Sequence, residues 1–119
     1  MSLKDLLNQG SIKLHKTSRE EIKNLLELIR RDIKDATVKT ISTDRRFATA
    51  YNAALQSATV VIYCKGYMPT GWGHHYTVFK ALKLIMGENY YDIADYFDSC
   101  RSKRNVTDYR HPRKSAIVS

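Results

Sequence analysis

The chain of 119 residues has little that could cross-link it and no long apolar run. Its two cysteines, Cys64 and Cys100, form no C-x-x-C pair and lie near no histidine at the spacing of metal ligands. This argues against a disulfide framework or a zinc site and favours two reduced thiols. No segment approaches the roughly 18 apolar residues of a membrane span, and residues 1–16 lack the apolar core of a signal peptide. We therefore expect a cytoplasmic protein that does not enter a membrane.

The composition is that of one soluble domain with an excess of positive charge. Hydrophobic residues make up 43% of the chain and charged residues 27%, which is typical of a globular fold. The net charge is +8, and residues 101–119 carry six basic residues against one acidic residue. Such a cluster suits an anionic partner, RNA first. A solvated basic tail has the same composition, so both interpretations stay open.

Apolar spacing predicts helices along most of the chain. Residues 3–8 form a short first helix, and TSRE at positions 17–20 matches a capping box that would start a helix at Thr17. That helix is predicted to end near Asp35. Residues 36–42 are rich in β-branched side chains and are expected to be a short extended connection. Residues 44–66 form the longest and most apolar helix, which Gly66 ends and which should be the centre of the core.

The second half of the chain continues the helical pattern. Residues 67–73 contain a proline and two glycines and are expected to form a turn. A helix over residues 74–86 stops at Gly87, and a last helix over residues 88–111 ends before Pro112. The pattern predicts an all-α fold, a four-helix up-and-down bundle with a short N-terminal helical arm. We divide the chain into the arm (1–16), the bundle (17–111) and a basic C-terminal tail (112–119).

Arg104 stands where an apolar residue is expected in the last helix. The preceding members of one helical stripe, spaced by three and four residues, are Tyr90, Ile93, Ala94, Phe97 and Cys100. An arginine at the next position either lies at the edge of the core with its stem buried or points toward a partner or substrate. Pairing with Asp108, four residues on, is a purely structural alternative.

The spacing of Arg104 and His111 suggests phosphodiester chemistry. They are seven residues apart and share one face of a continuous helix, whereas Tyr109 lies about 140° from Arg104. A symmetric dimer would bring two Arg/His pairs to one cleft. There a histidine moves a proton and an arginine stabilises charge on the phosphoryl oxygens, with no metal required.

The stretch RNVTDYRH resembles the signature of the HEPN superfamily (higher eukaryotes and prokaryotes nucleotide-binding domain). That motif is an Arg, usually followed by Asn or another polar residue, and a His after four to six residues; Arg104, Asn105 and His111 fit with six intervening residues. DRRFATAYNAALQSAT and GHHYTVFKAL also look like small bacterial HEPN proteins. The resemblance covers residues 17–111 and implies a helical bundle of HEPN type that forms a homodimer across the motif.

The resemblance also implies an activity, metal-independent endoribonuclease cleavage by the RNA 2′-hydroxyl, often in a toxin paired with a nucleotidyltransferase antitoxin. It would make Arg104 the phosphate stabiliser and His111 or Tyr109 the acid or base, with Asn105 and Asp108 orienting them. In this sequence Tyr109 occupies the position of the toxins' His and His111 that of their Tyr. Because tyrosine has a pKa near 10 and is a poor base, the exchange favours the alternative, a non-catalytic HEPN module that binds nucleotide or RNA or docks a nucleotidyltransferase.

Other basic residues are expected to contact RNA or phosphate. Adjacent histidines on a helix point about 100° apart and rarely share one metal, so we predict no metal site at GWGHHY and no cofactor. We interpret these histidines as packing and capping the turn; an additional hypothesis is that, with Trp72 and Tyr76, they stack a base. A third function, a basic tail that binds nucleic acid without specificity, predicts binding that falls steeply with salt and survives Arg104→Ala. The predicted phosphate contacts are Arg101, Lys103, Arg110, Arg45, Arg46 and His74.

Overall fold

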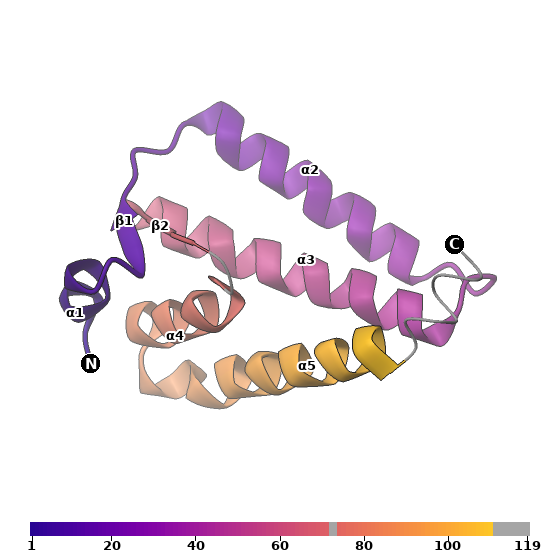
Figure 1. Cartoon of the computed structure of the whole chain (residues 1–119). Coiled ribbons are helices and arrows are strands. Elements are labelled where there is room, and N and C mark those ends of the chain that lie inside the picture. Colours follow the sequence, from indigo (N-terminus) through magenta and orange to yellow (C-terminus); the bar gives the residue numbers. More distant parts are fainter. Residues whose placement is uncertain (72–73, 111–119) are drawn as a thin grey trace.

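The fold is a small, mostly helical domain with one pair of short strands (Figure 1). The computed structural model describes residues 1–71 and 74–110, with the side chains of residues 74 and 102–110 left aside. None of the helices in these ranges is both long and apolar enough to cross a bilayer. The elements are α1 (Leu3–Asn8), β1 (Ile12–Leu14), α2 (Arg19–Ala36), α3 (Thr43–Cys64), β2 (Tyr67–Pro69), α4 (His74–Met86), the 3₁₀ turn η1 (Glu88–Tyr90) and α5 (Tyr91–Arg110).

The long helix α3 is the element on which the others pack. Its start is capped by the Ser42 hydroxyl, which accepts a hydrogen bond from the Arg45 amide, and Gly66 follows its end with a φ of 91°. One side of α3 contacts α2, and its other sides contact α4, α5 and β2. Its position at the centre of the core is as predicted. Its buried residues are Tyr51, Ala53, Leu55, Ala58 and Ile62.

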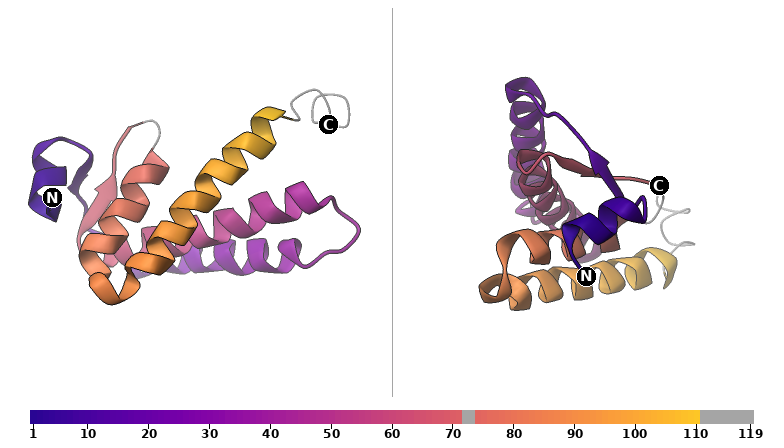
Figure 2. Two further views of the ribbon diagram at one scale, coloured as in Figure 1. Left: turned by 90° about the horizontal axis from the view of Figure 1, so that it is seen from below. Right: turned by 90° about the vertical axis from the view of Figure 1, so that its left-hand side faces the viewer.

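The long helices do not all pack on one another. In Figures 1 and 2, α2 runs antiparallel to α3, while α5 crosses below α3 and diverges from it. Within the described chain, α2 makes its extensive contacts with α3 alone, and α5 packs against α4 and α3. Helix α3 is therefore the central helix, with α2 packed on one side of it and α4 and α5 packed on the other.

A two-stranded antiparallel sheet makes the prediction of an all-α fold wrong in one respect. Strand β1 pairs with β2 in the register Ile12 to Pro69 and Leu14 to Tyr67. Ile12 is only 1% exposed and joins the core, as does Leu6 from α1. The sequence led us to expect extended chain at 36–42 and a turn at 67–73. Residue 36 is the last of α2, and residues 37–42 connect it to α3 without forming a strand. Residues 67–69 do form one, because they lie beside β1 and pair with it.

The junction between β1 and α2 is fixed by a glutamate. The predicted capping box at Thr17 is one residue early: Ser18 caps the helix and accepts from the Glu21 amide. The Glu21 carboxylate accepts a hydrogen bond from the Thr17 hydroxyl at 2.7 Å and lies 2.6 Å from Nε2 of His15. His15 in turn packs on the Tyr63 ring of α3, with 4.7 Å between ring centroids. Glu21 therefore ties the end of the sheet to the start of α2.

Acid should weaken this junction. Hydrogen bonds from His15 and Thr17 hold the pKa of Glu21 below its ordinary value of 4.5. Because the folded-state pKa is depressed, the stabilisation is complete above the ordinary pKa and is lost as pH falls through 4.5 to the lower folded value. Glu21→Gln should flatten the pH dependence of the unfolding free energy in that window, measured by urea unfolding. An unchanged slope in Glu21→Gln, or an equal change in the neighbouring exposed Glu20→Gln, would contradict this role.

The core should depend strongly on Phe79. Its side chain is 1% exposed and lies between Tyr51 and Phe97, with 6.0 Å to each ring centroid. Truncation leaves a cavity among three helices, so Phe79→Ala should cost about 3–5 kcal/mol in urea unfolding. The control Leu14→Ala, at a side chain 71% exposed, should change the unfolding free energy by about 0.5 kcal/mol or less. Equal effects of the two substitutions would contradict the assigned core.

Candidate nucleic-acid interface

Much of the predicted motif lies outside what the structure describes. The backbone of α5 carries position 104 one helical turn beyond Cys100 and Arg101. His111 lies outside the described residues, so neither its distance from Arg104 nor its role is tested. The same holds for the side chains of the other predicted residues in this stretch and of one at the start of α4: Lys103, Arg104, Asn105, Asp108, Tyr109, Arg110 and His74.

The apolar stripe predicted on α5 is narrower than expected. Ala94 is buried at 1% exposure, and Phe97 and Cys100 are half-buried against the core. Ile93, by contrast, is 52% exposed, and Tyr90, the last residue of the 3₁₀ turn η1, is 44% exposed. The reason is that α5 contacts α4 and α3 along one limited face, and side chains at its margin reach solvent.

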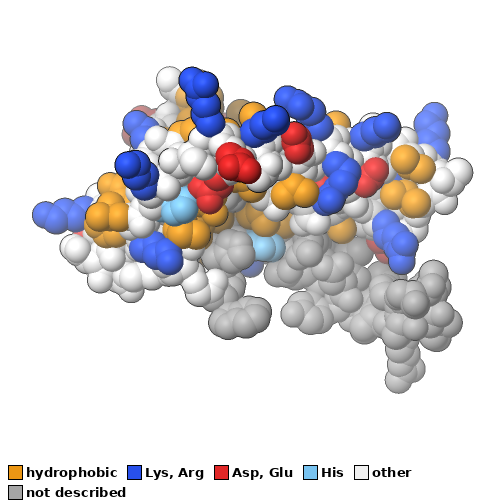
Figure 3. All heavy atoms as spheres, turned by 90° about the horizontal axis from the view of Figure 1, so that it is seen from above, with side chains coloured by type: hydrophobic (Ala, Val, Ile, Leu, Met, Phe, Trp, Pro, Cys, Tyr) orange, Lys and Arg blue, Asp and Glu red, His pale blue; other side chains and the backbone are white. Residues whose placement is uncertain are grey.

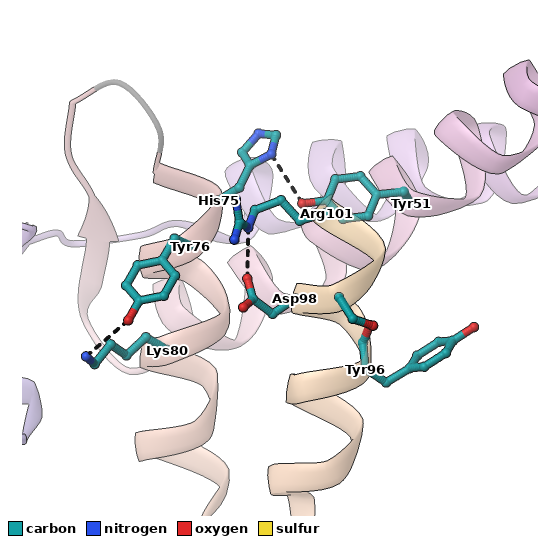
Figure 4. Close-up of polar contacts among 8 residues, drawn as sticks. Tyr51, His75, Tyr76, Lys80, Tyr96, Asp98 and Arg101 are labelled. Carbon is teal, nitrogen blue, oxygen red and sulfur yellow. Dashed lines mark hydrogen bonds and ion pairs between the residues drawn. The ribbon is translucent and has the colours of Figure 1, made fainter. Parts of the chain in front are cut away.

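Arg101 is held at the surface between α4 and α5. Its Nε donates to Oδ1 of Asp98 at 2.8 Å, one helical turn earlier. Its guanidinium carbon lies 6.0 Å from the centroid of the Tyr76 ring on α4 (Figure 4). Both contacts restrict the arginine, which reduces the entropy lost when it binds an anion. Among the predicted phosphate contacts, Arg101 is therefore one whose side chain is held beside an aromatic ring.

A histidine and a buried tyrosine meet at the start of α4. Nδ1 of His75 lies 3.2 Å from the Tyr51 hydroxyl, and the two ring centroids are 5.8 Å apart (Figure 4). Tyr51 is only 3% exposed, so its ring position is set by the core. His75 is half-buried and directly precedes Tyr76, the residue that faces Arg101. The hydrogen bond to Tyr51 therefore orients the His75 imidazole next to Tyr76, the ring that Arg101 contacts.

Two lysines extend the positive charge along α4. Lys80 Nζ lies 5.5 Å from the Tyr76 ring centroid and 3.4 Å from its hydroxyl. Lys83 Nζ bonds Oδ1 of Asp95 at 2.7 Å and lies 4.9 Å from the Tyr91 ring centroid. The hydrogen bond to Asp95 raises the pKa of Lys83, so this lysine is charged at neutral pH.

These groups line a cleft between α4 and α5. Its volume is about 380 Å³, and its floor includes Phe79 and Ala94. Tyr76 is 50% exposed and Tyr91 is 37% exposed, so both rings present area to a ligand. We call the whole surface the α4–α5 face. It comprises His75, Tyr76, Lys80, Lys83, Tyr91, Asp95, Asp98 and Arg101, with the buried Tyr51 of α3 behind His75.

The two predicted arginines of α3 have different surroundings. Arg46 donates from Nε to the Ala36 carbonyl at 3.0 Å and so fastens the α2–α3 connection. Arg45 is exposed and borders a surface hollow that also involves Val38 and Ile41. The hydrogen bond gives Arg46 a structural task, while Arg45 remains accessible to an anion.

Several residues of the α4–α5 face were missed by sequence reasoning. Lys80 lies four residues after Tyr76, which the sequence had already suggested for base stacking, and Asp95 and Asp98 are three apart, so each pair was recognisable as neighbours on one helix. The pairing of His75 with Tyr51 had no such signal, because it joins residues 24 apart through tertiary packing.

No family model, curated protein or solved structure matches this chain. In the part of the chain that the structure describes, no three His, Cys, Asp or Glu side chains gather as a metal site would require. We infer the function from the chemistry of the α4–α5 face itself.

The Tyr51 hydroxyl should set the tautomer of His75. Tyr51→Phe removes one partner of Nδ1, so the ¹⁵N chemical shifts of the His75 ring should move. The cost in unfolding free energy should be about 1 kcal/mol, the net value of one hydrogen bond. NMR of the labelled protein measures the shifts. Tyr63→Phe, which alters a ring that packs on His15 instead, should leave His75 unchanged; unaltered His75 shifts in Tyr51→Phe would contradict the assignment.

Proposed function

We propose that this chain is a HEPN-type RNA-binding domain that takes single-stranded RNA on the α4–α5 face. The observation that carries the proposal is the placement of three cations beside tyrosine rings: Lys80 and Arg101 at Tyr76, and Lys83 at Tyr91. Proteins that bind single strands combine cations that follow the phosphates with aromatic rings that stack on bases. The two lysines and both tyrosine rings line one cleft, and Arg101 lies beside it through its contact with the Tyr76 ring.

The charge of the chain supports the same proposal. The net charge is +8, and the sequence of α5 continues beyond Arg101 with Lys103, Arg104 and Arg110 against Asp108. Cations on one helix can neutralise successive phosphates of a strand and release their counterions. We further propose the bundle of HEPN type, with a homodimer that places two copies of Arg104 around one cleft, and a nucleotidyltransferase as a candidate partner.

Metal-independent RNA cleavage is a second candidate, favoured by the bond between His75 and Tyr51. In this reaction a base removes the 2′-hydroxyl proton, the 2′-oxygen attacks the adjacent phosphorus, and the 5′-oxygen leaves with a proton from an acid. If the Tyr51 hydroxyl donates to Nδ1, Nε2 of the neutral His75 ring already carries a proton and cannot act as the base; only the doubly protonated imidazolium can act as the acid. In the other tautomer Nε2 is suited to act as the base. Arg101 and Arg104 would stabilise the phosphorane charge.

RNA binding should depend on both rings and cations. Tyr76→Ala should weaken the binding of a fluorescent single-stranded oligonucleotide by about 1–3 kcal/mol, because one aromatic ring that stacks on a base is lost. Arg101→Gln should make the plot of log affinity against log salt concentration less steep, by about the amount that one phosphate contact contributes. Anisotropy titrations at several salt concentrations measure both. Lys23→Gln, on the exposed side of α2, is the matched control and should retain affinity; equal losses in all three variants would reject the α4–α5 face.

Cleavage is tested with the same proteins in EDTA. Wild type should convert RNA to fragments with 2′,3′-cyclic phosphate and 5′-hydroxyl ends, and Arg104→Ala and His75→Gln should each reduce the rate at least about a hundredfold. Cleavage that survives His75→Gln and fails in a His111→Gln variant would assign the proton transfer to His111 instead. Intact RNA with wild type, together with retained binding, would reject the nuclease and support the binding module.

A further inference from the structure

Helix α2 carries more apolar surface than α3 covers. The sequence predicts one apolar face on this helix, and the structure divides it. Ile29 is 9% exposed against the core, whereas Leu26 is 40% and Ile33 is 54% exposed. Since α2 makes its extensive contacts with α3 alone among the described elements, these two side chains have no helix packed over them.

The half-buried Ile22 and the exposed Leu26 and Ile33 form an apolar strip with a basic border. At 100° per residue, Ile22, Leu26 and Ile33 fall within about 40° of one another around the helix. Arg19, Arg30 and Lys23 follow within about the next 60°, on the side away from α3. Figure 3, which looks down on the molecule from the α2 side of Figure 1, shows Lys and Arg side chains along this face, with hydrophobic atoms and several Asp and Glu side chains between them. We call these six residues the α2 strip.

All of the α2 strip except Ile33 borders a shallow hollow, and its cations form no ion pair within the described residues. This hollow on α2 is lined by strip residues from Arg19 to Arg30 together with Glu27. Within the described ranges, Arg19, Lys23 and Arg30 form no ion pair; the one ion pair on the body of α2 joins Arg31 to Asp32. The apolar side chains of the strip therefore lie beside three cations. No acidic side chain of the described residues forms an ion pair with these cations.

We propose that the α2 strip docks an acidic, apolar helix of a partner protein. A helix laid along the groove would pack Leu-type side chains, spaced by three and four, against Ile22, Leu26 and Ile33. Its Glu or Asp residues would meet Arg19, Lys23 and Arg30, which supplies charge complementarity at the border. This surface is separate from the RNA site proposed on α4 and α5.

The chemistry of the strip favours a protein over other occupants. Single-stranded RNA is bound with aromatic rings, and the strip has only aliphatic and charged side chains. Helices that lie on membranes insert a wide apolar face, commonly with Trp or Phe, whereas the centre of the apolar face of α2 is already packed on α3. A second copy of the chain, placed symmetrically, would set Arg19, Lys23 and Arg30 against the same cations.

The probe is a synthetic amphipathic helical peptide with Leu at heptad positions and Glu at its charged positions. Anisotropy should show binding to the full chain that falls with salt, and no binding of the matched peptide with Lys in place of Glu. Leu26→Ser and Arg30→Glu should each weaken binding at least about tenfold, since one removes an apolar anchor and the other reverses a border charge. Leu14→Ser and Lys4→Glu, exposed positions outside the strip, should retain affinity, and circular dichroism melts confirm that each variant folds.

Each contrary result overturns the proposal in a recognisable way. No binding of the Glu peptide, or equal binding of both peptides, rejects an acidic partner helix. Loss of affinity in the control variants rejects the strip as the site. Binding of phosphatidylserine vesicles, or of RNA, that Leu26→Ser abolishes while the Glu peptide does not bind would assign the strip to that occupant instead. A dimer that Leu26→Ser dissociates would assign it to a second copy. None of these results depends on whether the α4–α5 face binds RNA.

Discussion

The packing of every other long helix onto α3 is the constraint on which the structure depends. Small residues such as Ala53 and Ala58, at 5% and 4% exposure, let neighbouring helices approach closely, and Ile62 is fully buried. Because α3 takes α2 on one side and α4 with α5 on others, the two outer surfaces of the domain face different directions. One presents cations beside tyrosine rings, and the other presents cations beside aliphatic side chains. These different chemistries suit different partners.

On the α4–α5 face, core packing fixes the groups that would meet RNA. Tyr51 is part of the α3 core and orients His75 through its hydroxyl, while Phe79 lies beneath the cleft that Lys80 and Lys83 border. The acids Asp95 and Asp98 hold Lys83 and Arg101 in place and reduce the local net charge. These ion pairs fix the positions of the two cations and at the same time weaken the attraction of the surface for an anion. In the proposed RNA complex, the tyrosine rings would therefore contribute to affinity alongside the cations.

The sequence predicted the helices well and their assembly less well. The bounds of α4 and the central place of α3 follow from apolar spacing and from the glycines that end each helix, since both signals are local. The β1–β2 pairing joins residues more than 50 positions apart, and no local pattern marks it. The exposure of Leu26, Ile33 and Ile93 was also unpredictable, because spacing shows that a side is apolar and not how much of it a neighbour covers. The motif from Arg104 to His111 remains a prediction from the resemblance.

The central claim is that single-stranded RNA binds between α4 and α5. The most direct test is a ¹⁵N-labelled chain titrated with a single-stranded RNA oligonucleotide and followed by NMR chemical-shift mapping. We predict that the largest shifts fall on His75, Tyr76, Lys80 and Arg101, and that they shrink as salt is raised. Shifts confined to α2, or no shifts at a salt concentration that preserves the fold, would contradict the claim.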